Sequence, residues 1–83
     1  MNQAIQVLDG CTYIDENNAL KVDLMCMGQM LACYVGGADK ERLIKLYNTK
    51  QFEMEELIEQ AFKLDKFNSN GEIWLTAEEI DTY

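Results

Sequence analysis

The sequence predicts an α+β domain in which a small N-terminal antiparallel sheet packs against two C-terminal helices, followed by a short final helix. Three observations support this class. Residues 5–25 contain short runs of β-forming residues separated by turn residues, residues 39–64 carry two helical patterns, and Gly36-Gly37 separates the two halves. An all-α bundle is the alternative, because residues 18–35 also fit one buried helix.

The N-terminal strands are predicted from turn signals and alternation. Two runs, residues 5–8 and 11–14, flank the pair Asp9-Gly10. An Asp-Gly pair between β-forming runs favours a tight hairpin, because glycine accepts positive φ easily. Residues 20–24 then alternate apolar and polar side chains, as a half-buried strand does. We therefore expect a three-stranded meander over residues 5–25.

The following segment has two interpretations. One is a buried helix over residues 18–35, with an apolar stripe at spacings of four, three, four and three. The other is a fourth strand over residues 30–35, with Gly28 in a turn or bulge. The upstream turn signals favour strands. With either period, the methionines of this region are predicted to fill the core. They are Met25, Met27 and Met30.

The helical half is predicted from periodicity and capping. Asp39 can cap a helix over about 39–48. A second helix over about 53–64 has an apolar face at i, i+3, i+4, i+7 and i+8. That face consists of Met54, Leu57, Ile58, Ala61 and Phe62. After a turn at residues 68–71, Thr76 and Glu79 have the spacing of a capping box, which starts a short last helix.

Length and composition limit the function classes. Eighty-three residues predict one domain spanning residues 1–83. The chain has no histidine, and its three cysteines match no zinc-ligand spacing, so we expect buried free thiols in a reducing compartment. No secretion signal or membrane-spanning stretch is present in the sequence, which favours the cytoplasm. No phosphate loop or nucleophile–base pair is visible either, so we predict a protein that is not an enzyme and has no cofactor or metal.

Charge is concentrated near the C-terminal end. Residues 53–83 hold nine acids and two bases, whereas residues 1–52 hold six acids and five bases. The net charge of −8 opposes direct binding to nucleic acid or to an anionic membrane. It favours a basic protein surface as partner, although solubility alone also explains an acidic composition. The oligomeric state is left open.

One stretch resembles a known family. Asp65-Lys66, then Asn68-Ser69-Asn70-Gly71-Glu72-Ile73, is similar to the loop of the EF-hand calcium-binding family, in which oxygen ligands surround a tight glycine. If Gly71 is the sixth loop residue, Lys66 stands first and Ala77 twelfth, so both acidic ligands are missing. If Glu79 is the twelfth, Ile73 occupies the glycine position. An Asn-Gly turn before a capped helix is therefore favoured, and calcium binding is an alternative function.

The carboxylates themselves are the preferred candidate site. Acids at i, i+3 and i+4 of a helix lie about 5–6 Å apart, and phosphates of duplex DNA repeat at about 3.4 Å per strand. The row could thus imitate nucleic acid in the basic groove of a nuclease or another nucleic-acid-binding protein. Small acidic phage proteins that block restriction or CRISPR enzymes are similar in size and charge, without a shared motif. A solvated helix face and a structural interaction subunit are the alternatives. The predicted contact residues are Glu53, Glu55, Glu56, Glu59, Glu72, Trp74, Glu78, Glu79 and Asp81.

The aromatic residues complete the prediction. Trp74 is expected in the core, because most tryptophans are largely buried, and an exposed Trp74 would instead serve as an interface anchor. The four tyrosines are dispersed along the sequence and predict no stacking platform.

Overall fold

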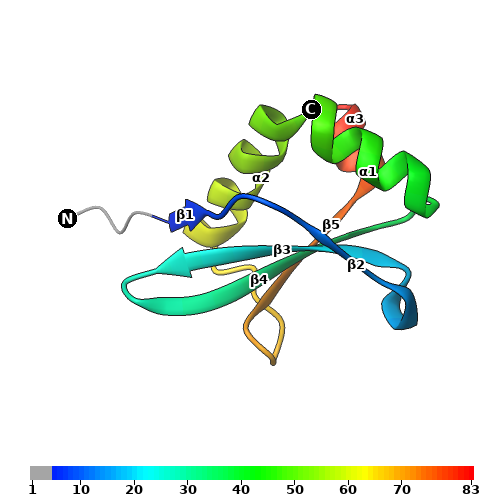
Figure 1. Ribbon diagram of the computed structural model, residues 1–83. Coiled ribbons are helices and arrows are strands. Elements are labelled where there is room, and N and C mark those ends of the chain that lie inside the picture. Colours follow the sequence, from blue (N-terminus) through cyan, green and yellow to red (C-terminus); the bar gives the residue numbers. More distant parts are fainter. Residues whose placement is uncertain (1–4) are drawn as a thin grey trace.

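A long antiparallel hairpin forms the centre of the protein. The computed structural model describes residues 5–83, and in it β3 (Ala19–Cys26) pairs with β4 (Gln29–Gly36) (Figure 1). Met27 and Gly28 connect the strands, both with positive φ (53° and 78°), as a two-residue hairpin turn requires. The strand interpretation of this region, including the fourth strand and the turn at Gly28, is confirmed. The single buried helix is wrong.

The N-terminal edge of the sheet differs from the prediction. β1 (Ile5–Val7) and β2 (Thr12–Ile14) do not pair with each other, and both are antiparallel to β3. They form two parts of one interrupted edge strand. The predicted Asp9-Gly10 hairpin and three-stranded meander are therefore wrong. Gly10 does adopt a positive φ of 95°, but its backbone N–H donates to the hydroxyl of Tyr47 at 2.9 Å, so the chain bulges and continues in the same direction. A 3₁₀ turn, η1 (Asp15–Asn17), leads into β3.

Two helices follow the hairpin, as predicted. In α1 (Lys40–Thr49), the Asp39 side chain accepts a hydrogen bond from the backbone N–H of Arg42 at 2.9 Å, which confirms the predicted cap. In α2 (Gln51–Lys63), the predicted apolar face is turned inward, with Met54, Ile58 and Ala61 buried.

The C-terminal segment adds a strand that changes the nature of the sheet. β5 (Glu72–Thr76) lies parallel to β4 at the edge opposite β1, and α3 (Ala77–Asp81) follows at once. The predicted α+β class, with its N-terminal strands and C-terminal helices, is confirmed. The expectation that the sheet is purely antiparallel is wrong, because β5 makes the sheet mixed. The two intervening helices return the chain to the starting end of β4, which is what a parallel neighbour requires.

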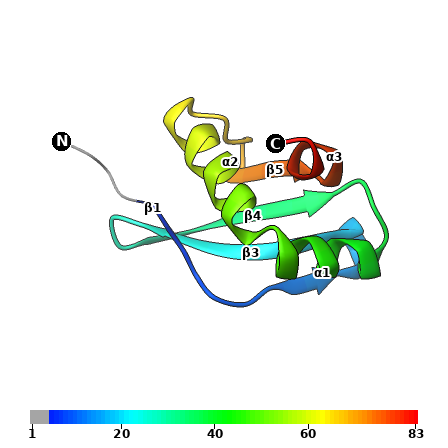
Figure 2. The same cartoon turned by 90° about the horizontal axis from the view of Figure 1, so that it is seen from above.

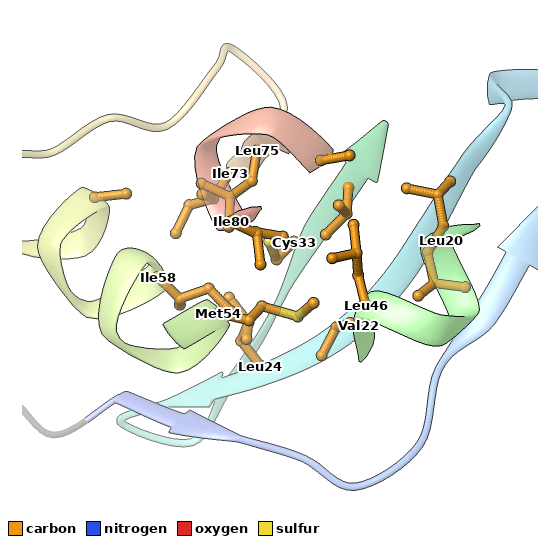
Figure 3. Packing of buried hydrophobic residues seen from close by; sticks show 14 residues of the cluster. Leu20, Val22, Leu24, Cys33, Leu46, Met54, Ile58, Ile73, Leu75 and Ile80 are labelled. Carbon is orange, nitrogen blue, oxygen red and sulfur yellow. The ribbon is translucent and has the colours of Figure 1, made fainter. Parts of the chain in front are cut away.

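Over residues 5–83, the three helices lie on one side of the sheet and leave the other side bare (Figures 1 and 2). The core between the layers is apolar and continuous (Figure 3). Its largest fully buried side chains are Leu20, Val22, Leu24, Cys33, Val35, Leu43, Met54, Ile58, Ile73 and Ile80. The fold is thus α+β, with one sheet face in the core and one in solvent. Within residues 5–83, no helix is long and apolar enough to cross a membrane.

Sulfur-containing residues divide between the two environments. Cys26 and Cys33 are buried free thiols, as predicted, whereas Cys11 is half-buried. Met27 and Met30 are 78% and 53% exposed, so their prediction as core residues is wrong. Met27 is in the tip of the β3–β4 hairpin, and Met30 is on the uncovered face of the sheet, where no helix packs.

Candidate functional site

The uncovered face of the sheet carries a row of side chains that the sequence does not place together. Because successive residues of a strand point to opposite faces, Ile73 and Leu75 enter the core and Glu72 and Trp74 point to solvent. Parallel pairing sets Trp74 beside Tyr34 of β4.

Trp74 and Tyr34 form an exposed aromatic stack. Their ring centroids are 4.7 Å apart and their planes differ by 15°. Trp74 is 45% exposed, so the expectation that it lies in the core is wrong, and so is the expectation that no tyrosine joins an aromatic platform. An offset stack of this kind contributes about 0.5–1.5 kcal/mol beyond burial. The stack fixes both rings upright on the bare face of the sheet.

Glu72 is held beside this stack by the preceding loop. Its Oε1 atom accepts from Asn68 Nδ2 at 3.0 Å and from Trp74 Nε1 at 3.4 Å. Asn68 Oδ1 in turn accepts the backbone N–H groups of Asn70 and Glu72, both at 2.9 Å. The predicted turn at residues 68–71 is confirmed, with Gly71 donating to the Asn68 carbonyl at 3.0 Å. In the described part of the chain, no group of three or more His, Cys, Asp or Glu side chains is placed to hold a metal ion, and calcium binding remains the alternative function.

The predicted acidic helix is present on the other side of the molecule. Glu55 and Glu59 of α2 are exposed, and Glu53 and Glu56 are half-buried. None of these four carboxylates lies within 4.0 Å of a lysine or arginine nitrogen; the ion pairs found among residues 5–83 are Lys21–Asp23 and Arg42–Asp81. We call these four carboxylates the α2 carboxylate row.

The phenol of Tyr83 contacts one member of the α2 carboxylate row, Glu56. The hydroxyl of Tyr83 donates to Glu56 Oε1 at 3.3 Å and accepts from Gln60 Nε2 at 3.3 Å. Desolvation and the negative charge and hydrogen bond of Glu56 raise the pKa of the Tyr83 phenol. The phenol therefore stays protonated at neutral pH and remains a hydrogen-bond donor to Glu56.

The acids of α3 have local roles that the charge count does not reveal. Glu79 completes a capping box with Thr76: Glu79 Oε1 accepts the backbone N–H of Thr76 at 2.9 Å, and Thr76 Oγ1 accepts that of Glu79 at 3.1 Å. Asp81 is paired with the guanidinium of Arg42 on α1. Glu78 is exposed and has no such partner. Of the three α3 acids, only Glu78 is free of a side-chain partner in the described structure.

The nine predicted contact residues therefore do not form one surface. Glu72 and Trp74 lie on the bare sheet face, whereas the acids of α2 and α3 belong to the helical side (Figure 1). Sequence reasoning missed the neighbours of Glu72 on the bare face. These are Asp23, Met30, Ala32 and Tyr34. The alternation at residues 20–24 placed Asp23 outward, but no sequence signal gives the cross-strand register.

Comparison with known proteins identifies the fold and no activity. No family model matches the chain, and no curated protein is significantly similar to it. A crystal structure of a protein of unknown function from the DUF1488 family of Shewanella loihica PV-4 is similar in fold, with a TM-score of 0.78. The two sequences are 22% identical, and the match covers 90% of this chain and 94% of that one. This likeness supports the α+β fold alone.

Proposed function

We propose that the protein is a small acidic protein-binding module that captures a basic partner through the α2 carboxylate row. The observation that carries this proposal is the absence of a lysine or arginine partner for Glu53, Glu55, Glu56 and Glu59 among residues 5–83. Unneutralised carboxylates on a rigid helix attract a cationic surface and accelerate its association.

The spacing of the row suggests the kind of partner. Neighbouring acids on one side of a helix are about 5–6 Å apart, which approaches the spacing of phosphates along one DNA strand. Lysines and arginines that bind phosphates would be able to bind these carboxylates with a similar dependence on salt. A basic groove of a nuclease or other nucleic-acid-processing enzyme therefore suits the row, and occupation of that groove would inhibit the enzyme.

The test compares two variants of equal net charge. In the first, Glu53, Glu55, Glu56 and Glu59 are all replaced by Gln. In the second, four exposed acids outside α2 are neutralised: Asp9→Asn, Asp15→Asn, Glu16→Gln and Glu41→Gln. Each purified protein, immobilised, is exposed to a lysate of its own host at 50 and 300 mM NaCl, and the captured proteins are identified by mass spectrometry.

The expected result is a basic nucleic-acid-binding protein retained by the wild type and by the second variant, but not by the first. Salt and added duplex DNA should both release it, because both compete for the same cationic groove. Equal loss with both variants would show that net charge alone matters and would refute the α2 carboxylate row as the site. Retention of an acidic partner that salt does not release would refute the proposal as well.

A further inference from the structure

The bare sheet face contains a hollow whose walls come from three adjacent strands and from Asn70 and Gly71 in the loop before β5. Its volume is about 380 Å³. Cross-strand pairing places Asp23 of β3, Ala32 of β4 and Glu72 of β5 in one row. Since neighbouring strands are about 4.8 Å apart, the two acids flank the alanine from either side. The short Ala32 side chain leaves the space between them open.

The walls of the hollow also include an aromatic ring and a thioether. Tyr34 and Met30 point to the same face of β4 as Ala32, one on each side of it. Tyr34 is held upright by its stack on Trp74. The hollow therefore combines two carboxylates, one aromatic wall and one polarizable apolar wall.

The charge of the hollow is negative and only partly compensated. Lys21 Nζ approaches Asp23 Oδ1 at 3.8 Å, a long pair between exposed side chains of the kind that contributes little. Among residues 5–83, the carboxylate of Glu72 accepts hydrogen bonds from neutral groups only, those of Asn68 and Trp74. A cation that enters the hollow would pair with the carboxylate of Glu72 and would be able to displace Lys21 from Asp23.

We propose that this hollow binds an arginine side chain of a basic partner protein. A guanidinium is planar, stacks on aromatic rings and donates several hydrogen bonds to carboxylates, so it matches the ring of Tyr34 and the carboxylate of Glu72 together. The protein's net charge of −8 complements a basic partner and opposes a second copy of this chain or a nucleic acid. This site is distinct from the α2 carboxylate row, because the two lie on opposite sides of the sheet.

The probe is a short neutral-background peptide with one arginine, compared with the same peptide carrying lysine or citrulline. Trp74 is the only tryptophan, so its fluorescence reports on the stack directly, and the backbone amide signals of Ala32 and Gly71 report on the hollow by NMR. The arginine peptide should shift all three signals and bind at least several-fold more tightly than the lysine peptide. The citrulline peptide, which lacks the charge, should bind at least tenfold more weakly.

Two variants alter the hollow by independent means, and one serves as the matched control. Glu72→Gln removes the charge, and Ala32→Leu fills the space without changing charge. Each variant should lower the affinity for the arginine peptide by tenfold or more. Glu41→Gln makes the same charge change at an exposed position outside both proposed sites, and it should weaken binding of the arginine peptide less than twofold. Unchanged circular dichroism spectra would verify that the variants remain folded.

Three results would overturn the proposal. The first is equal binding of the citrulline and arginine peptides. The second is equal weakening of arginine-peptide binding by Glu41→Gln and Glu72→Gln. The third is a shift of the Ala32 and Gly71 signals that depends on protein concentration without peptide. The last result would assign the hollow to a contact between two copies of the chain. None of these results depends on the α2 carboxylate row, so the two proposals can fail separately.

Discussion

Glu78 and Glu79 are adjacent acids in the first turn of α3, and we predict that their removal has different consequences. Glu79 accepts the backbone N–H of Thr76 at 2.9 Å and its hydroxyl at 3.3 Å, whereas the carboxylate of Glu78 is exposed to solvent without a partner in the described structure. Both carboxylates have the same favourable interaction with the helix dipole. Glu79→Ala should therefore destabilise the protein more than Glu78→Ala.

The size of the difference follows from the capping box. Loss of the dipole interaction costs about 0.3–1 kcal/mol in either variant. Glu79→Ala also leaves the Thr76 N–H without its acceptor at the junction of β5 and α3, which costs about 1 kcal/mol more. For a domain of this length, a difference of about 1 kcal/mol corresponds to a shift of about 4–8 °C in Tm.

Urea unfolding monitored by Trp74 fluorescence and circular dichroism measures the free energy of unfolding of both variants. Thr76→Ala and the double variant complete a double-mutant cycle, in which we expect a coupling of at least about 0.5 kcal/mol between the two side chains. Equal destabilisation by Glu78→Ala and Glu79→Ala, together with additivity in the cycle, would refute the capping box. Glu79 would then be as available to a partner as Glu78.

Two further predictions concern burial and the loop before β5. Burial raises the pKa of the Cys33 thiol from 9.0 to about 12, so the native state keeps a proton that the unfolded state loses. The stabilisation that comes from the protonated Cys33 thiol is intact below pH 9. Above pH 9, the free energy of unfolding falls by up to about 1.4 kcal/mol per pH unit. Cys33→Val should flatten this pH dependence in urea titrations, and identical slopes for the two proteins would contradict the prediction. Asn68→Ala should lower the free energy of unfolding by about 1–3 kcal/mol, because two backbone N–H groups lose their acceptor. The control Ser69→Ala, in the same exposed turn, should change the free energy of unfolding by less than about 0.5 kcal/mol. Urea titration measures both variants.

The helices were predictable because their signals are local. The cap at Asp39, the capping box at Thr76 and the apolar face of α2 are each specified by residues within three or four positions of one another. The structure reproduces all three. The choice of strands over a buried helix at residues 18–35 rested on local turn chemistry and on the alternation at residues 20–24, and it was confirmed.

Strand partners could not be predicted, because they depend on residues far apart in the sequence. The turn chemistry at Gly10 was recognised, but a glycine with positive φ serves a bulge in an edge strand as well as a hairpin. The parallel pairing of β5 with β4 depends on how α1 and α2 return the chain, and no residue in β5 encodes it.

The same limitation explains what was missed in the candidate site. The apolar triplet Ile73-Trp74-Leu75 must place one side chain on the opposite face from the other two, and only the positions of the helices determine which face is covered. Because the core takes Ile73 and Leu75, Trp74 is left on the bare face with Glu72. A count of acidic residues along the sequence therefore combined two surfaces that the sheet separates.

This separation determines how charge can act in the protein. Glu72 points away from the helices, so the sheet lies between it and the α2 carboxylate row (Figure 1), and electrostatic screening at physiological ionic strength takes effect over about 8 Å. The charge of the α2 carboxylate row is therefore largely screened from a partner bound at Glu72. In the same way, the charge of Glu72 is largely screened from a partner bound to α2. It follows that the net charge of −8 governs long-range attraction at low salt, while binding at physiological salt depends on each face alone. For any partner that contacts both faces, the changes in binding free energy caused by Glu72→Gln and by neutralising the α2 carboxylate row should then be additive.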